Sequence, residues 1–366
     1  MATPSRRWSG EWGRPHGPAA PDVDVLIPTA GRTTELALTL AGLAAQDDPA
    51  FRVIVSDQSD DGAAARDPGV RAMLRILEAQ GRPTRLLRNL PRRGLAAQRQ
   101  FLLDASAAAS VLFLDDDVWL EPGLLARLHT ALTTLRCGFV GSAVQGLSYL
   151  GDVRPHETAA FEPWGNGVLP ERVRRGEPAF ERWPLHNAAN LVHLAADLDV
   201  ARDGWLAYRI AWVGACVLYR RAALVASGGF DFWEQLPADH AGEDVAAEWR
   251  VMETYGGAGI LPSGAVHLEA PTTIERRDVD AFDVVFDEDA ATRPVDDRQE
   301  EERGRAMPTP IEIQKFLGGL DYPAVKDDIL AKAESEGADD AVLDALRGIP
   351  DGEYDAPTAI SKAVSN

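Results

Sequence analysis

The chain has 366 residues, of which 45% are hydrophobic and 26% are charged, as in ordinary globular proteins of one or two domains. Its 37 basic and 57 acidic residues give a net charge of −20, which argues against broad binding to nucleic acids. The two cysteines, Cys137 and Cys216, have no metal-ligand spacing, which favours a reducing compartment. Because no segment resembles a membrane span or a signal peptide, we expect a cytoplasmic protein, with the inner face of the membrane as an alternative location.

The N-terminal segment, residues 1–20, is rich in Pro, Gly and Arg and has no periodic pattern. This composition is typical of a disordered tail. Trp8 and Trp12, together with the arginines near them, leave peripheral contact with a membrane as an alternative.

From residue 21 onward, strand patterns alternate with helical patterns. The first expected strands cover residues 23–27, 52–55 and 84–87, and the first expected helices cover 33–46, 70–80 and 95–108. Residues 141–210 show no clear pattern, as is common in insertions that form part of a substrate pocket. After them we expect a strand at 212–220, helices at 222–226 and 243–255, and extended segments at 259–261 and 265–268. This alternation predicts an α/β fold with a mostly parallel sheet.

The C-terminal part of the chain changes character twice. Acids dominate residues 276–306, which predicts an acidic linker. Residues 307–366 then form a small all-α domain in our interpretation, with short helices at 310–317, 326–336 and 338–348. This domain contains no metal cluster, nucleophile or basic stripe, so we expect an accessory role, such as docking to a protein partner.

The apolar run at residues 111–114 leads directly into three acids, Asp115, Asp116 and Asp117. A short apolar run of this composition predicts a buried strand. Carboxylates at its end need a cation, because burying them unpaired is costly. A divalent metal that also binds phosphates meets this need. A solvated acidic turn is the alternative.

Polar groups also follow other strands: Pro28 and Thr29 with Arg32, then Asp57, and later the pair Glu243-Asp244. Because the carboxyl ends of parallel strands face one crevice, we expect these groups to converge with the three acids.

Six short motifs carry a resemblance to a known family. They are Val25-Leu26-Ile27-Pro28-Thr29, Val53-Ile54-Val55-Ser56-Asp57, Gly94 with Arg99, Leu114-Asp115-Asp116-Asp117, Gly228-Gly229-Phe230-Asp231 and Glu243-Asp244. In this order they resemble family 2 glycosyltransferases, which implies the GT-A nucleotide-sugar-binding fold over residues 21–275. Residues 307–366 resemble a small helical bacterial domain of unknown function.

The resemblance implies that the chain binds a nucleoside-diphosphate sugar with Mg²⁺ or Mn²⁺. It implies Asp117 as a direct metal ligand, and His267 as a further metal or phosphate contact. A core histidine is the alternative for His267. Asp115 is expected to face the ribose, and Asp116 the donor sugar or the water molecules on the metal.

The remaining donor contacts are expected around the nucleotide. Asp57 is expected to accept from the base or the ribose, with Pro28 and Thr29 on the same wall, while Arg32 and Arg99 complete the donor site. A surface arginine is the alternative for Arg99. The sequence Asp57-Gln58-Ser59-Asp60 departs from the family's Asp-Asp-Gly-Ser pattern, which leaves the nucleobase open.

Catalysis is expected at the start of the helix at 243–255. The resemblance implies Asp244 as the base that takes the acceptor's proton, although an acid at a helix N-terminus also stabilises the helix. Trp212, Gly214 and Glu243 are expected on the acceptor side. Attack opposite the diphosphate inverts the anomeric carbon without a covalent intermediate.

Other functions remain open at this stage. The acceptor is a glycan, a lipid-linked glycan or a small molecule. A catalytically inactive sugar- or protein-binding module on the same scaffold is the main alternative. A sugar-nucleotide nucleotidyltransferase is disfavoured, because the segment after the first strand lacks that class's glycine-rich, basic signature.

Overall fold

The computed structural model describes most of the chain, with gaps. The described residues are 5–15, 17, 20–165, 167–186, 188–198, 200–201, 204–272, 279–286, 323–335, 338, 340–354, 360 and 363–364. They belong to two compact units, Met1–Phe286 and Asp287–Asn366. No helix among these residues combines the length and apolarity needed to cross a membrane.

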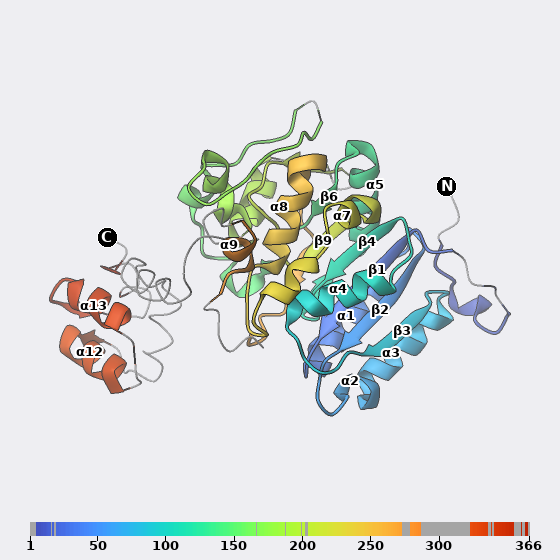
Figure 1. Cartoon of the computed structure of the whole chain (residues 1–366), viewed down its shortest axis with the longest axis horizontal. Helices are drawn as coiled ribbons and strands as arrows, with labels where there is room; N and C mark the ends of the chain where they lie inside the picture. The colour runs from blue at the N-terminus through green and yellow to red at the C-terminus, as the bar shows by residue number, and fades with distance from the viewer. Residues whose placement is uncertain are drawn as a thin grey trace. The chain divides into compact units, whose positions relative to one another are not determined.

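A central eight-stranded sheet organises the first unit (Figure 1). In spatial order its strands are β3 (Thr84–Arg88), β2 (Phe51–Asp57), β1 (Val23–Thr29), β4 (Ser110–Leu114), β9 (Cys216–Arg220), β6 (Phe139–Gly141), β10 (Gly257–Leu261) and β8 (Leu206–Tyr208). The first four strands are parallel, whereas β9 and β8 run antiparallel to their neighbours. The predicted α/β fold with a mostly parallel sheet is confirmed.

Both faces of this sheet are buried, because successive side chains of a strand point to opposite faces. In β1, Val25 and Ile27 pack into one hydrophobic cluster and Leu26 into the other. In β4, Leu112 joins the first cluster and Phe113 the second. Such strands have continuous apolar sequences, which is why they could be predicted.

Helices cover the two faces. The first cluster includes side chains from α1 (Thr33–Ala44), α3 (Pro68–Ala79) and α5 (Leu124–Leu135). The second includes side chains from α4 (Leu95–Ala105), α7 (Arg221–Ala226), α8 (Glu243–Tyr255) and α9 (Ala281–Phe286). The remaining α-helices of this unit are α2 (Ala63–Arg66) and α6 (Ala188–Asp197). The described part of 141–210 is mostly irregular, with 3₁₀ helices at Leu147–Tyr149, Pro155–Thr158 and Pro178–His186.

A second, three-stranded sheet joins distant parts of the chain. It has the order β5 (Val118–Leu120), β11 (Ala265–His267) and β7 (Gln145–Gly146). His267 pairs with Val118 in the antiparallel register of β11 and β5. Since Val118 directly follows Asp117, this register brings His267 beside the acidic strand end.

The strand expected at 212–220 is shorter than predicted, because β9 begins only at Cys216. Ala215, just before it, has a φ of 67°, a left-handed conformation that interrupts extended backbone. The carbonyl of Ala215 accepts a hydrogen bond from the backbone N–H of Asp115 at 2.9 Å. The interruption therefore lies next to the acidic strand end.

The N-terminal segment expected to be disordered is ordered over residues 5–15. Ser5 N–H donates to Asp48 Oδ1 at 2.8 Å, and Arg7 N–H donates to the carbonyl of Gln80 at 2.9 Å. A 3₁₀ helix follows at Ser9–Glu11. These bonds to segments that follow α1 and α3 explain the order, which a composition without periodicity did not reveal.

The first unit also extends beyond the expected boundary at residue 275. Helix α9, at Ala281–Phe286, buries Phe282 in the cluster that contains α8. Residues 287–306 of the expected acidic linker lie outside the described residues.

The second unit contains α12 (Lys326–Ser335), α13 (Asp340–Gly348) and a short antiparallel pair, β12 (Ala324–Val325) with β13 (Glu353–Tyr354). Ile329, Leu346 and Ile360 are fully buried in its own hydrophobic cluster. Two of the expected helices are present, but the β pair shows that the unit is not purely α-helical. The helix expected at 310–317 lies outside the described residues.

Candidate active site

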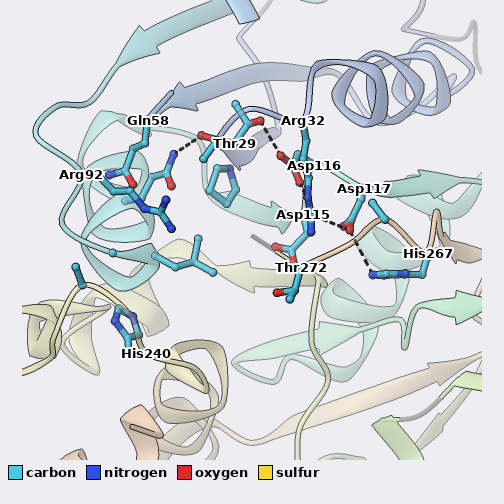
Figure 2. A pocket seen from close by; sticks show the side chains of 17 residues that line it. Thr29, Arg32, Gln58, Arg92, Asp115, Asp116, Asp117, His240, His267 and Thr272 are labelled. Atoms are coloured by element: carbon cyan, nitrogen blue, oxygen red, sulfur yellow. Dashed lines mark hydrogen bonds and ion pairs between the residues drawn. The ribbon is translucent and has the colours of Figure 1, made fainter. Parts of the chain in front are cut away.

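A cleft of about 350 Å³ opens at the carboxyl ends of β1, β2 and β4. Its lining includes Pro28 and Thr29 at the end of β1, Arg32 after that strand, and Asp115, Asp116 and Asp117 after β4, together with His267 from β11 (Figure 2). Of the residues expected to converge, Pro28, Thr29, Arg32 and the three acids line this cleft, whereas Asp57, Glu243 and Asp244 do not. Because β1 and β4 are parallel neighbours in the sheet, the residues at their carboxyl ends face one space.

Arg32 pairs with two of the three acids. Its Nη1 lies 2.6 Å from Asp117 Oδ2 and 3.3 Å from Asp116 Oδ1. Thr29 Oγ1 donates to Asp116 Oδ2 at 2.7 Å. Burial nevertheless raises the pKa of Asp116 to about 7, against the opposing effects of Thr29 and Arg32. One arginine does not fully compensate two buried carboxylates.

Asp117 also faces His267, whose Nε2 lies 3.4 Å from Asp117 Oδ2. Burial raises the pKa of Asp117, with Asp115 adding to the rise and His267 and Arg32 opposing it. Glu269 N–H donates to His267 Nδ1 at 2.9 Å, so the proton of a neutral ring resides on Nε2, toward Asp117.

The Asp117–His267 pair fits a divalent ion. Ligands on adjacent corners of an octahedral ion are about 3 Å apart, close to the 3.4 Å between these two atoms. Among the described residues no three His, Cys, Asp or Glu side chains form a metal-binding group. Mg²⁺ sites, however, commonly combine one or two carboxylates with substrate phosphates, and Mn²⁺ also accepts oxygen ligands. Coordination of an ion through His267 Nε2 would require the ring proton to move to Nδ1. The hydrogen bond from Glu269 N–H to Nδ1 would then have to break.

Arg99 lies beneath the cleft and is not part of its lining. Its Nη2 lies 2.8 Å from Asp115 Oδ1 and its Nε 3.0 Å from Glu243 Oε1, with only 3% of the side chain exposed. Arg99, expected to complete the donor site, therefore reaches this cleft only through Asp115, and the alternative of a surface arginine is wrong. Helix α4 turns this side chain inward, where it joins the strand end of β4 to the start of α8.

Helix α8 begins with Glu243 after Gly242, whose φ of 71° suits glycine. Glu243 is 3% exposed, so its carboxylate serves Arg99 and does not face an acceptor as predicted. Burial raises the pKa of Glu243 to about 7, with Asp244 adding to the rise and Arg99 opposing it. Burial also raises the pKa of Asp244, Arg99 opposes this shift and Asp115 adds to it.

The segment at 211–214 lies against α8. A Cβ on Gly214 would stand 3.1 Å from Asp244 Oδ2, so the missing side chain leaves room at the carboxylate. Val213 N–H donates to Glu248 Oε2 at 2.9 Å. Glu248, fully buried one helical turn after Asp244, was missed from the sequence, although the i, i+4 spacing of the two acids was visible.

Trp212 lies on the same segment but packs within the protein. Its ring lies 4.9 Å from that of His186 and 5.7 Å from that of Phe180, measured between ring centres. Trp212 is only partly buried, so this packing neither supports nor contradicts the predicted role of its ring in acceptor binding.

Asp57 is fully buried behind the cleft wall. Its Oδ1 accepts from Ser59 N–H at 2.8 Å and from Ser59 Oγ at 2.5 Å. The next residue, Gln58, lines the cleft instead, and its Nε2 has no hydrogen-bond partner among the described residues. The side chain that faces the cleft at this strand end is thus Gln58, which the sequence did not single out.

Two further polar residues line the cleft from α4 and the segment before α8. Gln98 Nε2 donates to the carbonyl of Ser56 at 2.6 Å and that of Thr29 at 3.2 Å, and so ties β1 and β2 together. His240 Nε2 accepts from Ala96 N–H at 3.1 Å while Nδ1 donates to the carbonyl of Pro237 at 2.7 Å. Burial lowers the pKa of His240, so this ring is neutral and positions the first turn of α4.

Several solved structures are similar to this chain. A mannosyltransferase from Pyrobaculum calidifontis, in complex with GDP-Man and Mn²⁺, has 19% sequence identity and a TM-score of 0.44; the match covers 72% of this chain and 64% of that one. S. aureus TarS 1–349 has 14% identity and a TM-score of 0.43, covering 94% and 88%. The same protein in complex with UDP has 13% identity and a TM-score of 0.44, covering 89% and 91%.

No protein of curated function matches the sequence. Family models do match: residues 24–196 match glycosyl transferase family 2, and residues 308–361 match the family of unknown function DUF2795. The mostly parallel sheet agrees with the GT-A fold that the motifs implied. The chain is therefore similar to glycosyl transferase family 2 over residues 24–196 and to the DUF2795 family over residues 308–361.

Proposed function

We propose that this protein is an inverting, metal-dependent glycosyltransferase that moves a sugar from a nucleoside diphosphate to an acceptor hydroxyl. The observation that carries the proposal is the pairing of Asp117 with His267 in a cleft that shares one charge network with Asp244. Arg99 links the two sides, because it bonds Asp115 on the donor side and Glu243, the neighbour of Asp244.

The donor side suits a nucleotide. Pro28, Thr29 and Gln58 line the same cleft and would contact the nucleoside. Asp115 is the most exposed of the three acids, at 31%, and a carboxylate held by Arg99 at one oxygen suits the ribose hydroxyls. Arg32 would contact the diphosphate, because a guanidinium matches phosphate geometry.

Asp117 and His267 would hold Mg²⁺ or Mn²⁺. The ion, when bound, would neutralise charge on the departing diphosphate. Asp116 lies beside them, bonded to Thr29 and Arg32, and would support the donor sugar or the water around the ion.

Asp244 would act as the base. It lies at the start of α8, where Gly214 leaves space at its carboxylate. Burial raises the pKa of Asp244. A general base works best when its pKa lies near the pH of the reaction, so this shift suits proton transfer. As the acceptor oxygen attacks the anomeric carbon, its proton passes to Asp244 and the sugar–phosphate bond breaks. A single displacement of this kind inverts the anomeric centre.

The acceptor side would include Trp212 and Gly214 and would receive a hydroxyl of a glycan, a lipid-linked glycan or a small molecule. We place the reaction in the cytoplasm, where nucleotide sugars are made, with the inner membrane face as the alternative. The DUF2795 domain would act as an accessory unit, for example by docking a protein partner.

Thermal unfolding with a panel of nucleoside diphosphates tests the donor assignment, because a ligand of the native state raises the unfolding temperature. We expect one of UDP, GDP or dTDP to stabilise the protein, and to stabilise it more with Mn²⁺. Failure of all three in the presence of Mn²⁺ would contradict the proposal. Asp61→Asn, at an exposed carboxylate paired with Arg66, is the control and should respond as the unaltered protein does.

A further inference from the structure

Arg32 contacts Asp117, one of the two residues proposed to bind the metal ion. It directly precedes α1 as its N-cap residue, and 16% of its side chain is exposed. Figure 2 shows it beside Asp116, on the side of the cleft that also holds Asp117 and His267. Its Nη2 donates to the carbonyl of Pro271, in the segment that follows β11.

The carboxylate atom bound most closely by Arg32 is the one that a metal would need. Asp117 Oδ2 lies 2.6 Å from Arg32 Nη1 and 3.4 Å from His267 Nε2. A divalent ion on this oxygen would be next to the guanidinium, and two neighbouring cations in a part-buried site repel each other strongly. Arg32 and the ion therefore compete for one oxygen.

The guanidinium also has a donor to spare. Arg32 Nε is buried and has no hydrogen-bond partner among the described residues. A buried donor without an acceptor is unfavourable, and an incoming anion would relieve it. Diphosphate oxygens suit this role, since the guanidinium fork binds phosphate by more than one hydrogen bond.

We propose that Arg32 competes with the divalent ion for Asp117 and transfers to the diphosphate when ion and diphosphate bind together. This inference rests on the proposed metal-dependent function. In the free protein Arg32 satisfies Asp116 and Asp117. In the loaded protein the ion takes over Asp117, and the diphosphate gives the displaced guanidinium a new partner.

The exchange has a thermodynamic consequence. The ion alone must displace Arg32 without compensation, so it binds weakly. Diphosphate removes that penalty, so ion and diphosphate each strengthen the binding of the other by the same factor. Without a guanidinium at position 32, the ion alone binds more tightly and this source of coupling disappears.

Mn²⁺ binding, followed by electron paramagnetic resonance of the free ion, tests the exchange without any donor sugar or acceptor. The unaltered protein is compared with Arg32→Met, which keeps an aliphatic side chain without charge, and with Arg32→Lys, which keeps the charge without the fork. Each is titrated with and without inorganic pyrophosphate, and a protein-free titration corrects for Mn²⁺ bound by pyrophosphate itself. Arg92→Ala is the matched control, because Arg92 lines the same cleft beside Gln58, on the opposite side (Figure 2).

We expect Arg32→Met to bind Mn²⁺ alone about tenfold more tightly than the unaltered protein, since it removes a charge-assisted hydrogen bond to the ligand oxygen. Arg32→Lys should fall between them. Pyrophosphate should tighten Mn²⁺ binding about tenfold in the unaltered protein and clearly less in Arg32→Met.

Two results would overturn the exchange while leaving the metal site intact. One is equal Mn²⁺ affinity in the unaltered protein and Arg32→Met. The other is an equal gain in Arg92→Ala, which would indicate a general effect of charge. Absence of Mn²⁺ binding in every protein, with and without pyrophosphate, would instead contradict the metal-dependent function itself.

Discussion

The two sides of the cleft are built from different kinds of structure. On the donor side, Thr29 ends strand β1 and Asp115 follows strand β4, and these two strands pair along four residues of the buried sheet. On the acceptor side, Trp212 and Gly214 lie on an irregular segment that α8 holds through Val213 and Glu248. Under the proposed function, the nucleotide and the ion would therefore meet the edge of a buried sheet, whereas the acceptor would meet a surface whose shape depends on contacts between a helix and a loop.

Charge is distributed differently as well. Asp116 and Asp117 share Arg32, whose side chain is partly exposed. Glu243, at the start of α8, depends on Arg99, which is almost fully buried and is bonded to Asp115 as well. We therefore expect changes at the first arginine to alter ligand binding, and changes at the second to alter the structure that joins both sides.

The largest effect is expected for Asp244→Asn, which should change catalysis on the acceptor side without changing binding on the donor side. The amide cannot take the acceptor's proton, so release of nucleoside diphosphate from the donor should fall about a thousandfold. Donor binding, measured by thermal stabilisation, should stay unchanged because the donor side is intact. Glu253→Gln, in the last turn of the same helix, should retain turnover. Normal turnover in Asp244→Asn would remove this residue as the base.

Arg99→Met tests the link between the sides. It leaves Asp115 and Glu243 without their shared cation, and breaking a buried ion pair costs about 3 kcal/mol of unfolding free energy. Chemical denaturation measures this loss. Arg99→Lys keeps the charge but not both bonds, so it should lose less stability. Arg99→Met with full stability would show that the cluster does not join the two sides.

A smaller effect concerns pH and the donor side alone. Asp116 has a reference pKa of 3.8, and burial raises its pKa to about 7 in the folded protein. Between these values the folded state keeps a proton that the unfolded state has lost, so stability falls as pH rises through this window. Asp116→Asn should lessen the fall between about pH 5 and pH 7 by on the order of 1 kcal/mol. The control Asp61→Asn, at an exposed carboxylate, should show the same fall as the unaltered protein.

The sequence predicted most of the residues that line the cleft at the ends of β1 and β4, for physical reasons. Strands buried on both faces have continuous apolar runs, and their polar ends are visible as abrupt changes of composition. Asp117 and His267 are 150 positions apart, yet the motifs implied a shared site, and the pairing of β11 with β5 brings them together. The apolar patterns of β5 and β11 do not by themselves predict which of their residues pair.

The positions that were predicted wrongly depend on side-chain direction. Arg99 has the sequence surroundings of a cleft residue, but the rotation of α4 points it into the protein. Asp57 ends β2, but its carboxylate turns back to Ser59, so Gln58 faces the cleft. The left-handed backbone of Ala215 shortens β9, and no local pattern signals that conformation for an alanine. Such features follow from packing between elements far apart in the chain.

Turnover of Asp117→Ala, measured with and without a metal chelator, tests most directly that a divalent ion at the end of β4 supports sugar transfer. We expect chelator to abolish turnover in the unaltered protein. We expect the variant to retain only a small residual rate, because the ion would lose its carboxylate ligand. Full turnover in Asp117→Ala that is insensitive to chelator would contradict metal-dependent transfer at this site.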